Sequence, residues 1–249
     1  MKSKEGVQTL LVVWQDEKSR SYYHIGTLSY YSGLYEFAYT LKEGKDKLDD
    51  ALKNGYMIHP AFPDTTKNYR SETLFKAFDR RIPSSDRKDY NEILVDLGLH
   101  EWASKMDILR ATRGRLASDT YSFEQPLRIE NHNNLRSRFF IHGMRHRNLP
   151  SEWSLWVKEN SALRLVQEPN NESDPYAVVV YTQNGKHLGY IPAFYSNAIF
   201  SLIENGLSPI VRVVYVNEKS HPHWWIQVSL ECDIPIEQES QTEELFAVI

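Results

Sequence analysis

The chain has 249 residues, a net charge of −4 and a single cysteine, Cys232. One cysteine excludes an intrachain disulfide framework and every zinc or redox motif that needs several cysteines. The small net charge gives no support to the wrapping of a long nucleic acid, so any nucleic-acid contact should be short. The apolar run near the N-terminus is about six residues long, below the roughly 7–15 of a signal-peptide core. We therefore expect a cytoplasmic protein with no membrane partner.

The first forty residues predict an antiparallel β-meander. Residues 8–15 form an apolar run typical of a strand, and residues 21–30 and 33–41 follow it closely. Between Leu34 and Tyr39 aromatic residues alternate with smaller ones, which is the period of two expected of a half-buried sheet.

Four helical segments are predicted after the meander, over residues 45–55, 70–82, 89–99 and 104–114. In the second, Ser71 is a candidate N-cap, and apolar residues recur behind it at helical spacing: Leu74, Phe75, Phe78 and Ile82. We interpret Phe75 and Phe78 as core residues rather than partner contacts, because their spacing places them on the apolar face.

From Arg136 the pattern returns to short strands, interrupted by one helix over residues 193–206. The strands are expected over residues 136–144, 162–168, 176–182, 186–191, 208–217 and 223–231. Several short strands with one or two helices favour a small, strongly curved β-barrel over a βαβ sheet. The predicted fold class is α+β, with a first domain over 1–125, a barrel domain over 126–233 and an acidic tail over 234–249.

The segment from Asn131 to Ser151 is basic and contains no acid. It holds four arginines, Arg136, Arg138, Arg145 and Arg147. A run of charge is usually a solvated face, but the absence of acids over twenty residues also suits phosphate contacts. Arg138 and Arg145 are therefore candidate nucleic-acid contacts.

The stretch "VQEPNNESDPYAVVVYTQNGKHLGYIP", Val166 to Pro192, holds the most information. Asn and Asp after Pro are ordinary turn residues that bond their own backbone. Their combination with the following strand, the Asn-Gly turn and Gly-Tyr-Ile-Pro is similar to the HIRAN domain, over roughly residues 136–232. That resemblance implies an OB-like β-barrel, which in helicase-linked members captures the 3′ end of single-stranded DNA. Tyr176 stands where the family often has Asn, and Ser173 where the helicase-linked members have Tyr.

The resemblance also implies contact residues. Asn170, Asn171 and Asp174 match the loop that lines the end pocket, "GMRH" matches a Gly-hydrophobic-Arg-aromatic segment, and Tyr190 falls where a polar ring is expected. Asp174 would accept a hydrogen bond from a free 3′-hydroxyl, which an internal nucleotide lacks. Arg145 would hold a phosphate and His146 would stack on a base. With Ser173 in place of Tyr, a stacking contact of about 1–3 kcal/mol per base is lost.

The first half resembles the N-terminal subdomain of HipA-type toxin kinases, over roughly residues 8–125. The likeness rests on "YHIGTLSYYSGLYEFAYT", "YRSETLFKAFDRRIPSSDR" and "MDILRATRGRLASDTYSF". Here "IPSSDR" replaces the family's Leu-Pro-Glu-Gly, and the kinase body is absent. The resemblance implies a surface, within residues 1–125, that docks on a kinase or another component of a toxin–antitoxin or phage-defence system.

No catalytic constellation is recognisable in the sequence. The phosphate-binding, kinase, hydrolase and metalloprotease motifs are missing, and His221 and His223 have no identifiable third metal ligand. We expect no metal, no cofactor and no enzymatic activity. Two hypotheses follow: a non-enzymatic protein that binds DNA ends or single strands, with the 3′ end preferred, or a protein-interaction module that acts through residues 1–125.

Overall fold

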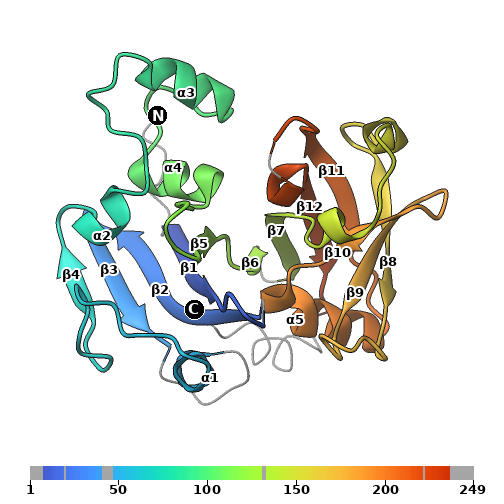
Figure 1. The fold of residues 1–249 in the computed structure, drawn as a ribbon, viewed down its shortest axis with the longest axis horizontal. Helices are drawn as coiled ribbons and strands as arrows, with labels where there is room; N and C mark the ends of the chain where they lie inside the picture. The colour runs from blue at the N-terminus through green and yellow to red at the C-terminus, as the bar shows by residue number, and fades with distance from the viewer. Residues whose placement is uncertain (1–7, 20, 41–46, 131–132, 221, 236–249) are drawn as a thin grey trace. The chain divides into compact units, whose positions relative to one another are not determined.

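The computed structural model describes residues 8–19, 21–40, 47–130, 133–220 and 222–235 (Figure 1). It separates into two compact units, Met1–Pro126 and Leu127–Ile249. Each unit has its own antiparallel sheet, of five strands in the first and seven in the second. The expected α+β class is confirmed. Within the described ranges, no helix has the length and apolar character needed to cross a bilayer.

The sheet of the first unit has the strand order β4-β3-β2-β1-β5. Its strands are β1 (Gln8–Gln15), β2 (Tyr22–Tyr31), β3 (Leu34–Tyr39), β4 (Tyr69–Ser71) and β5 (Tyr121–Glu124). The first three form the expected meander. Ser32 and Gly33 join β2 to β3 with positive φ at both positions, 51° and 82°. That is the conformation of the tight two-residue hairpin turn whose twist matches the flanking strands.

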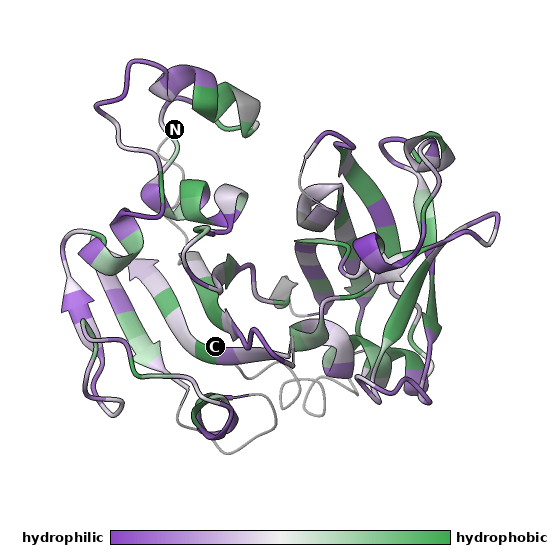
Figure 2. Cartoon of the chain, viewed as in Figure 1, coloured by the Kyte–Doolittle hydropathy of each residue, from purple (hydrophilic) through white to green (hydrophobic). Residues whose placement is uncertain are grey.

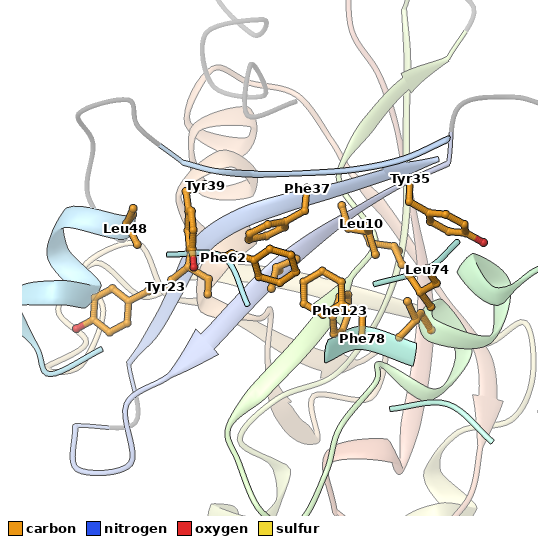
Figure 3. Packing of buried hydrophobic residues seen from close by; sticks show 14 of the residues in the cluster. Leu10, Tyr23, Tyr35, Phe37, Tyr39, Leu48, Phe62, Leu74, Phe78 and Phe123 are labelled. Atoms are coloured by element: carbon orange, nitrogen blue, oxygen red, sulfur yellow. The ribbon is translucent and has the colours of Figure 1, made fainter. Parts of the chain in front are cut away.

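An aromatic cluster fills the core of the first unit (Figure 3). The ring of Phe62 lies 4.5 Å from that of Phe37 and 5.2 Å from that of Phe78, which in turn lies 5.0 Å from Phe123. Phe75 packs against the same cluster at 5.2 Å from Phe62. The interpretation of Phe75 and Phe78 as core residues is confirmed.

The helices of the first unit are short. They are α1 (Leu48–Lys53), α2 (Lys76–Asp79), α3 (Tyr90–Asp96) and α4 (Lys105–Thr112). The helix expected over residues 70–82 is wrong in its first half, because Ser71 pairs with Tyr35 as the last residue of β4. Strand pairing with β3 thus overrides the helical spacing. The Ser71 hydroxyl instead accepts a hydrogen bond from the Thr73 amide, at 3.2 Å.

The second unit consists of a strongly curled sheet with the order β10-β9-β8-β11-β12-β7-β6. Its strands are β6 (Arg128–Glu130), β7 (Asn134–Phe140), β8 (Ala162–Gln167), β9 (Val178–Thr182), β10 (His187–Tyr190), β11 (Ile210–Val216) and β12 (Ile226–Asp233). Helix α5 (Ala193–Glu204) follows β10. The curled, barrel-like architecture predicted for this half is confirmed.

Residues alternate between a buried and an exposed face along β7, β11 and β12, as the hydropathy colouring shows (Figure 2). Cys232 is buried opposite Leu135, and burial raises the pKa of its thiol to about 11. It is a packed residue, as expected from the sequence. Ile234 is also buried, and its amide donates to the carbonyl of Asn133 at 2.6 Å. The acidic residues of the predicted tail lie outside the described residues.

Because β5 belongs to one sheet and β6 to the other, we predict that each unit folds by itself. Limited proteolysis of the native protein should cut within residues 124–135 and leave two fragments that resist further digestion. Circular dichroism of each separated fragment should show a cooperative melting transition. Loss of one fragment as soon as the chain is cut would contradict this prediction.

Candidate nucleic-acid interface

A single β-bridge between His142 and Tyr190 joins the chain after β7 to β10. The His142 amide donates to the Tyr190 carbonyl and the Tyr190 amide donates to the His142 carbonyl, each at 2.9 Å. Four strands separate β7 from β10 in the sheet order, namely β12, β11, β8 and β9. The bridge therefore connects two distant parts of the curled sheet. It also brings the "GMRH" turn beside the ring of Tyr190.

Two glycines permit this close approach. A Cβ atom added at Gly189 would lie 2.3 Å from the carbonyl oxygen of His142, closer than any real contact. Gly143 has a φ of +73°, and a Cβ there would lie 3.2 Å from a ring carbon of Tyr190. Glycine at these two places is a requirement of the bridge and of the turn beside it. Both belong to the segments that carry the HIRAN resemblance.

Asn171 organises the polar loop between β8 and β9. Its side-chain oxygen accepts from the amides of Ser173 and Asp174, at 3.0 and 3.1 Å. Its side-chain amide donates to Glu168 at 2.6 Å. Asn171 thus has the structural role of an ordinary turn residue and at the same time orients the carboxylate of Glu168. Asn170, next to it, is exposed.

Asp174 fastens the loop to α5. One of its carboxylate oxygens accepts from the amide of Tyr176 at 2.9 Å, and the other accepts from the hydroxyl of Ser196 at 2.6 Å. Asp174 remains partly exposed. Since a carboxylate offers about four lone-pair positions, each oxygen retains room for one further donor.

Tyr190 lies at the centre of a compact group of side chains. Its hydroxyl donates to Glu168 at 3.1 Å, the same carboxylate oxygen that Asn171 contacts. The guanidinium of Arg147 lies 5.4 Å from the centre of the Tyr190 ring, and the ring of His187 lies 5.2 Å away. Burial and the hydrogen bond to Glu168 raise the pKa of the Tyr190 hydroxyl. The phenol is therefore neutral and serves as a donor.

His187 and Arg147 contact each other within this group, with 3.5 Å between Nδ1 and Nη1. Burial, and then the positive charge of Arg147, lower the pKa of His187. In the described structure, His187 Nε2 and Arg147 Nε are buried and make no hydrogen bond. Other atoms of both side chains are partly exposed, which makes Arg147 and His187 candidate contacts for a polar ligand.

Some of the predicted nucleic-acid contacts lie close to Tyr190, and others do not. Arg145 and His146 are exposed on the 3₁₀ turn Met144–His146, where Arg145 Nε donates to His146 Nε2 at 2.9 Å. Asn171 contacts Glu168, which in turn accepts a hydrogen bond from Tyr190, and Asp174 lies in the same loop as Asn171. Arg138 lies apart from it, exposed on β7 opposite Ser229.

Sequence reasoning missed three members of the group. Arg147 lies in the acid-free basic stretch and could have been chosen there. Glu168 and His187 carry no signal of their own, because the pairing of β9 with β8 and β10 places Glu168 beside Tyr190 and a bulge in β10 places His187 there. Among the described residues, no three His, Cys, Asp or Glu side chains come together as metal ligands. His221 lies outside the described ranges.

The charges of the two units are arranged differently. In the first unit Arg70 pairs with Glu36, and Arg81 forms a bidentate pair with Asp119. Arg145 and Arg147, by contrast, form no ion pair with a carboxylate in the described part of the chain. Cations without carboxylate partners remain available to phosphates.

Comparison with known proteins identifies the domain that contains these side chains. Residues 135–237 match the family model of the HIRAN domain, which confirms the resemblance predicted over roughly residues 136–232. The structure is similar to the HIRAN domain of human HLTF, with 17% identity, a TM-score of 0.38, and coverage of 47% of this chain and 88% of that one. It is also similar to a protein from Lactobacillus plantarum, with 18% identity, a TM-score of 0.36, and coverage of 41% and 99%. No curated protein matches the chain. The HipA-like character of residues 1–125 stays a prediction.

We predict that Gly189→Ala destabilises the second unit. The added methyl collides with the His142 carbonyl, and a clash of this kind typically costs about 1–3 kcal/mol of unfolding free energy. Urea denaturation of the full chain measures the loss. Gly185→Asn is the matched control, since Gly185 has open space around it and Asn tolerates its positive φ. Equal midpoints for the two variants would contradict the role given to the bridge.

Proposed function

We propose that the HIRAN domain of this protein binds single-stranded DNA and prefers a free 3′ end. The observation that supports it best is the grouping of the partly exposed side chains of Arg147, His187 and Tyr190 inside a HIRAN domain. Guanidinium groups bind phosphates, and aromatic rings stack on unpaired bases. Arg145 and His146 extend the same surface, because both are exposed on the adjoining turn.

End selectivity is assigned to Asp174. Both of its oxygens already accept one hydrogen bond within the chain, so the carboxylate is held in a fixed orientation. A terminal 3′-hydroxyl donates to a remaining lone pair, whereas the corresponding oxygen of an internal nucleotide is esterified and has no proton to donate. A 3′-phosphate would instead bring a second negative charge towards Asp174.

We predict that Asp174→Asn weakens binding of a 3′-hydroxyl strand by about 1.5–3 kcal/mol, since it removes a charged acceptor. Fluorescence polarisation at fixed salt measures the change. Ser196→Ala is the control for the loop, because it removes the contact to α5 and keeps the carboxylate. Ser196→Ala should leave the preference for a hydroxyl end in place, and Asp174→Asn should abolish it. Equal loss in both variants would show that Asp174 acts only through the loop.

A second experiment compares the binding of three single-stranded DNAs of one sequence. One ends in a 3′-hydroxyl, one ends in a 3′-phosphate and one is circular. Arg145→Ala should weaken all three alike and lower the salt slope by about one unit, as loss of a phosphate contact does. If the native protein binds all three equally, end recognition is wrong. If it binds none, the protein-interaction hypothesis takes its place.

In the first unit, Trp102 favours that alternative, because its side chain is 74% exposed and stacks on His100 at 4.7 Å.

We propose further that the protein catalyses no reaction on ATP or DNA, because the phosphate-binding and metal-binding motifs are missing from the sequence. Purified protein incubated with ATP or DNA and with magnesium or manganese should leave both substrates unchanged. Chromatography of the nucleotides and gel analysis of the DNA measure this. Cleavage that copurifies with the native protein and disappears in a point variant would contradict the proposal.

A further inference from the structure

Three arginines project from the exposed face of the seven-stranded sheet, each from a different strand. Arg138 on β7 is opposite Ser229 on β12, and Ser229 is opposite Arg212 on β11. Arg212 is opposite Ala162, which lies two residues before Arg164 on β8. Directly paired residues share a face of a sheet, and so do residues two apart along a strand. Since all three arginines are exposed, they form a row across the outer face.

Aromatic residues continue this row towards Tyr190. Arg164 is paired with Tyr181, and its guanidinium lies 5.3 Å from the centre of that ring. Tyr181 is paired with His187, with 5.1 Å between the two rings, and His187 lies 5.2 Å from Tyr190. A register shift between His187 and Gly189 allows His187 and Tyr190, three positions apart, to meet on one face.

The arginines of the row lack carboxylate partners among the described residues. In the ranges that the structure describes, Arg138, Arg164 and Arg212 form no ion pair with a carboxylate. Their neighbour Arg136 does, with Glu231 at 3.5 Å. The other outward acid nearby, Asp233, accepts a hydrogen bond from Asn134 at 2.7 Å. The row therefore keeps its positive charge and suits an anionic chain.

We infer that this face is a track for single-stranded DNA whose 3′ end lies beside Tyr190, an inference that rests on the proposed function. The three arginines contact successive phosphates, and Tyr181 and His187 offer their rings to unpaired bases. A duplex suits the aromatic part of the track less well, because its bases are already stacked and paired. The track gives the domain a site longer than the end pocket alone.

The track is tested by measuring, with fluorescence polarisation, the affinity for single-stranded DNAs of two lengths that both end in a 3′-hydroxyl. Strands of about 3 and about 12 nucleotides lie below and within the usual site size of OB-type folds. The native protein should bind the longer strand more tightly. Tyr181→Ala should lower affinity for the longer strand about fivefold or more and leave the shorter one unchanged. Thermal melting of the variant, compared with the native chain, reports whether the fold is kept.

A triple variant, with Arg138, Arg164 and Arg212 all changed to Gln, provides a second test that removes the charges and keeps the aromatic rings. It should lower the salt slope for the longer strand by about two units, as expected for three phosphate contacts on a single strand. Tyr31→Ala and Arg87→Gln in the first unit are matched controls, because both side chains are exposed there and lie outside the HIRAN domain.

The outcomes separate the two proposals. If the native protein binds neither strand, the proposed function fails. If it binds both strands equally well, and neither the Tyr181 variant nor the triple variant changes the longer strand, the track is overturned while the end site stands. Equal losses in the first-unit controls would also overturn the track, since charge or aromatic content in general would then explain the effect.

Discussion

The two hydrogen bonds between His142 and Tyr190 are the constraint on which the candidate site depends. They connect strands that are far apart in the sheet order, and they do so where Gly189 leaves no room for a side chain. As a result the turn that carries Arg145 and Arg147 lies against the same ring that Glu168 and His187 contact. An open sheet of the same strands would leave the turn after β7 far from Tyr190 on β10 and would expose unpaired backbone groups at His142 and Tyr190.

Charge pairing supports the proposal that the second unit, rather than the first, binds nucleic acid. The overall charge of −4 gives no indication of such a surface. In the first unit, arginines such as Arg81 and Arg113 are buried against Asp119 and Glu124, where they hold the β-sheet and the α4 end together. In the described part of the HIRAN domain, by contrast, Arg145 and Arg147 form no ion pair with a carboxylate, and neither do Arg138, Arg164 and Arg212 on the outer face; only Arg136 does, with Glu231. Local pairing therefore carries more information about the ligand than composition does.

Strands with a clear period of two, such as β3, β7 and β12, were predictable because the pattern is local. Strands β4 and β6 were not, since three residues are too few to show a period. The predicted helix over residues 70–82 was shortened by pairing with β3, which depends on a distant segment. The same distinction holds for the site. Asn171 and Asp174 follow from a motif, whereas Glu168 and His187 reach Tyr190 only through strand pairing and the bulge in β10.

Hydrogen–deuterium exchange of the full chain, with and without a saturating 3′-hydroxyl single strand, tests most directly whether the HIRAN domain holds the DNA site. The account predicts slower exchange over residues 142–147, 168–176 and 187–191, because the ligand contacts the turn, the loop and β10 together. Amides of β1, β2 and β3 in the first unit should exchange at unchanged rates. Protection confined to the first unit, or no protection anywhere at saturation, would contradict the account.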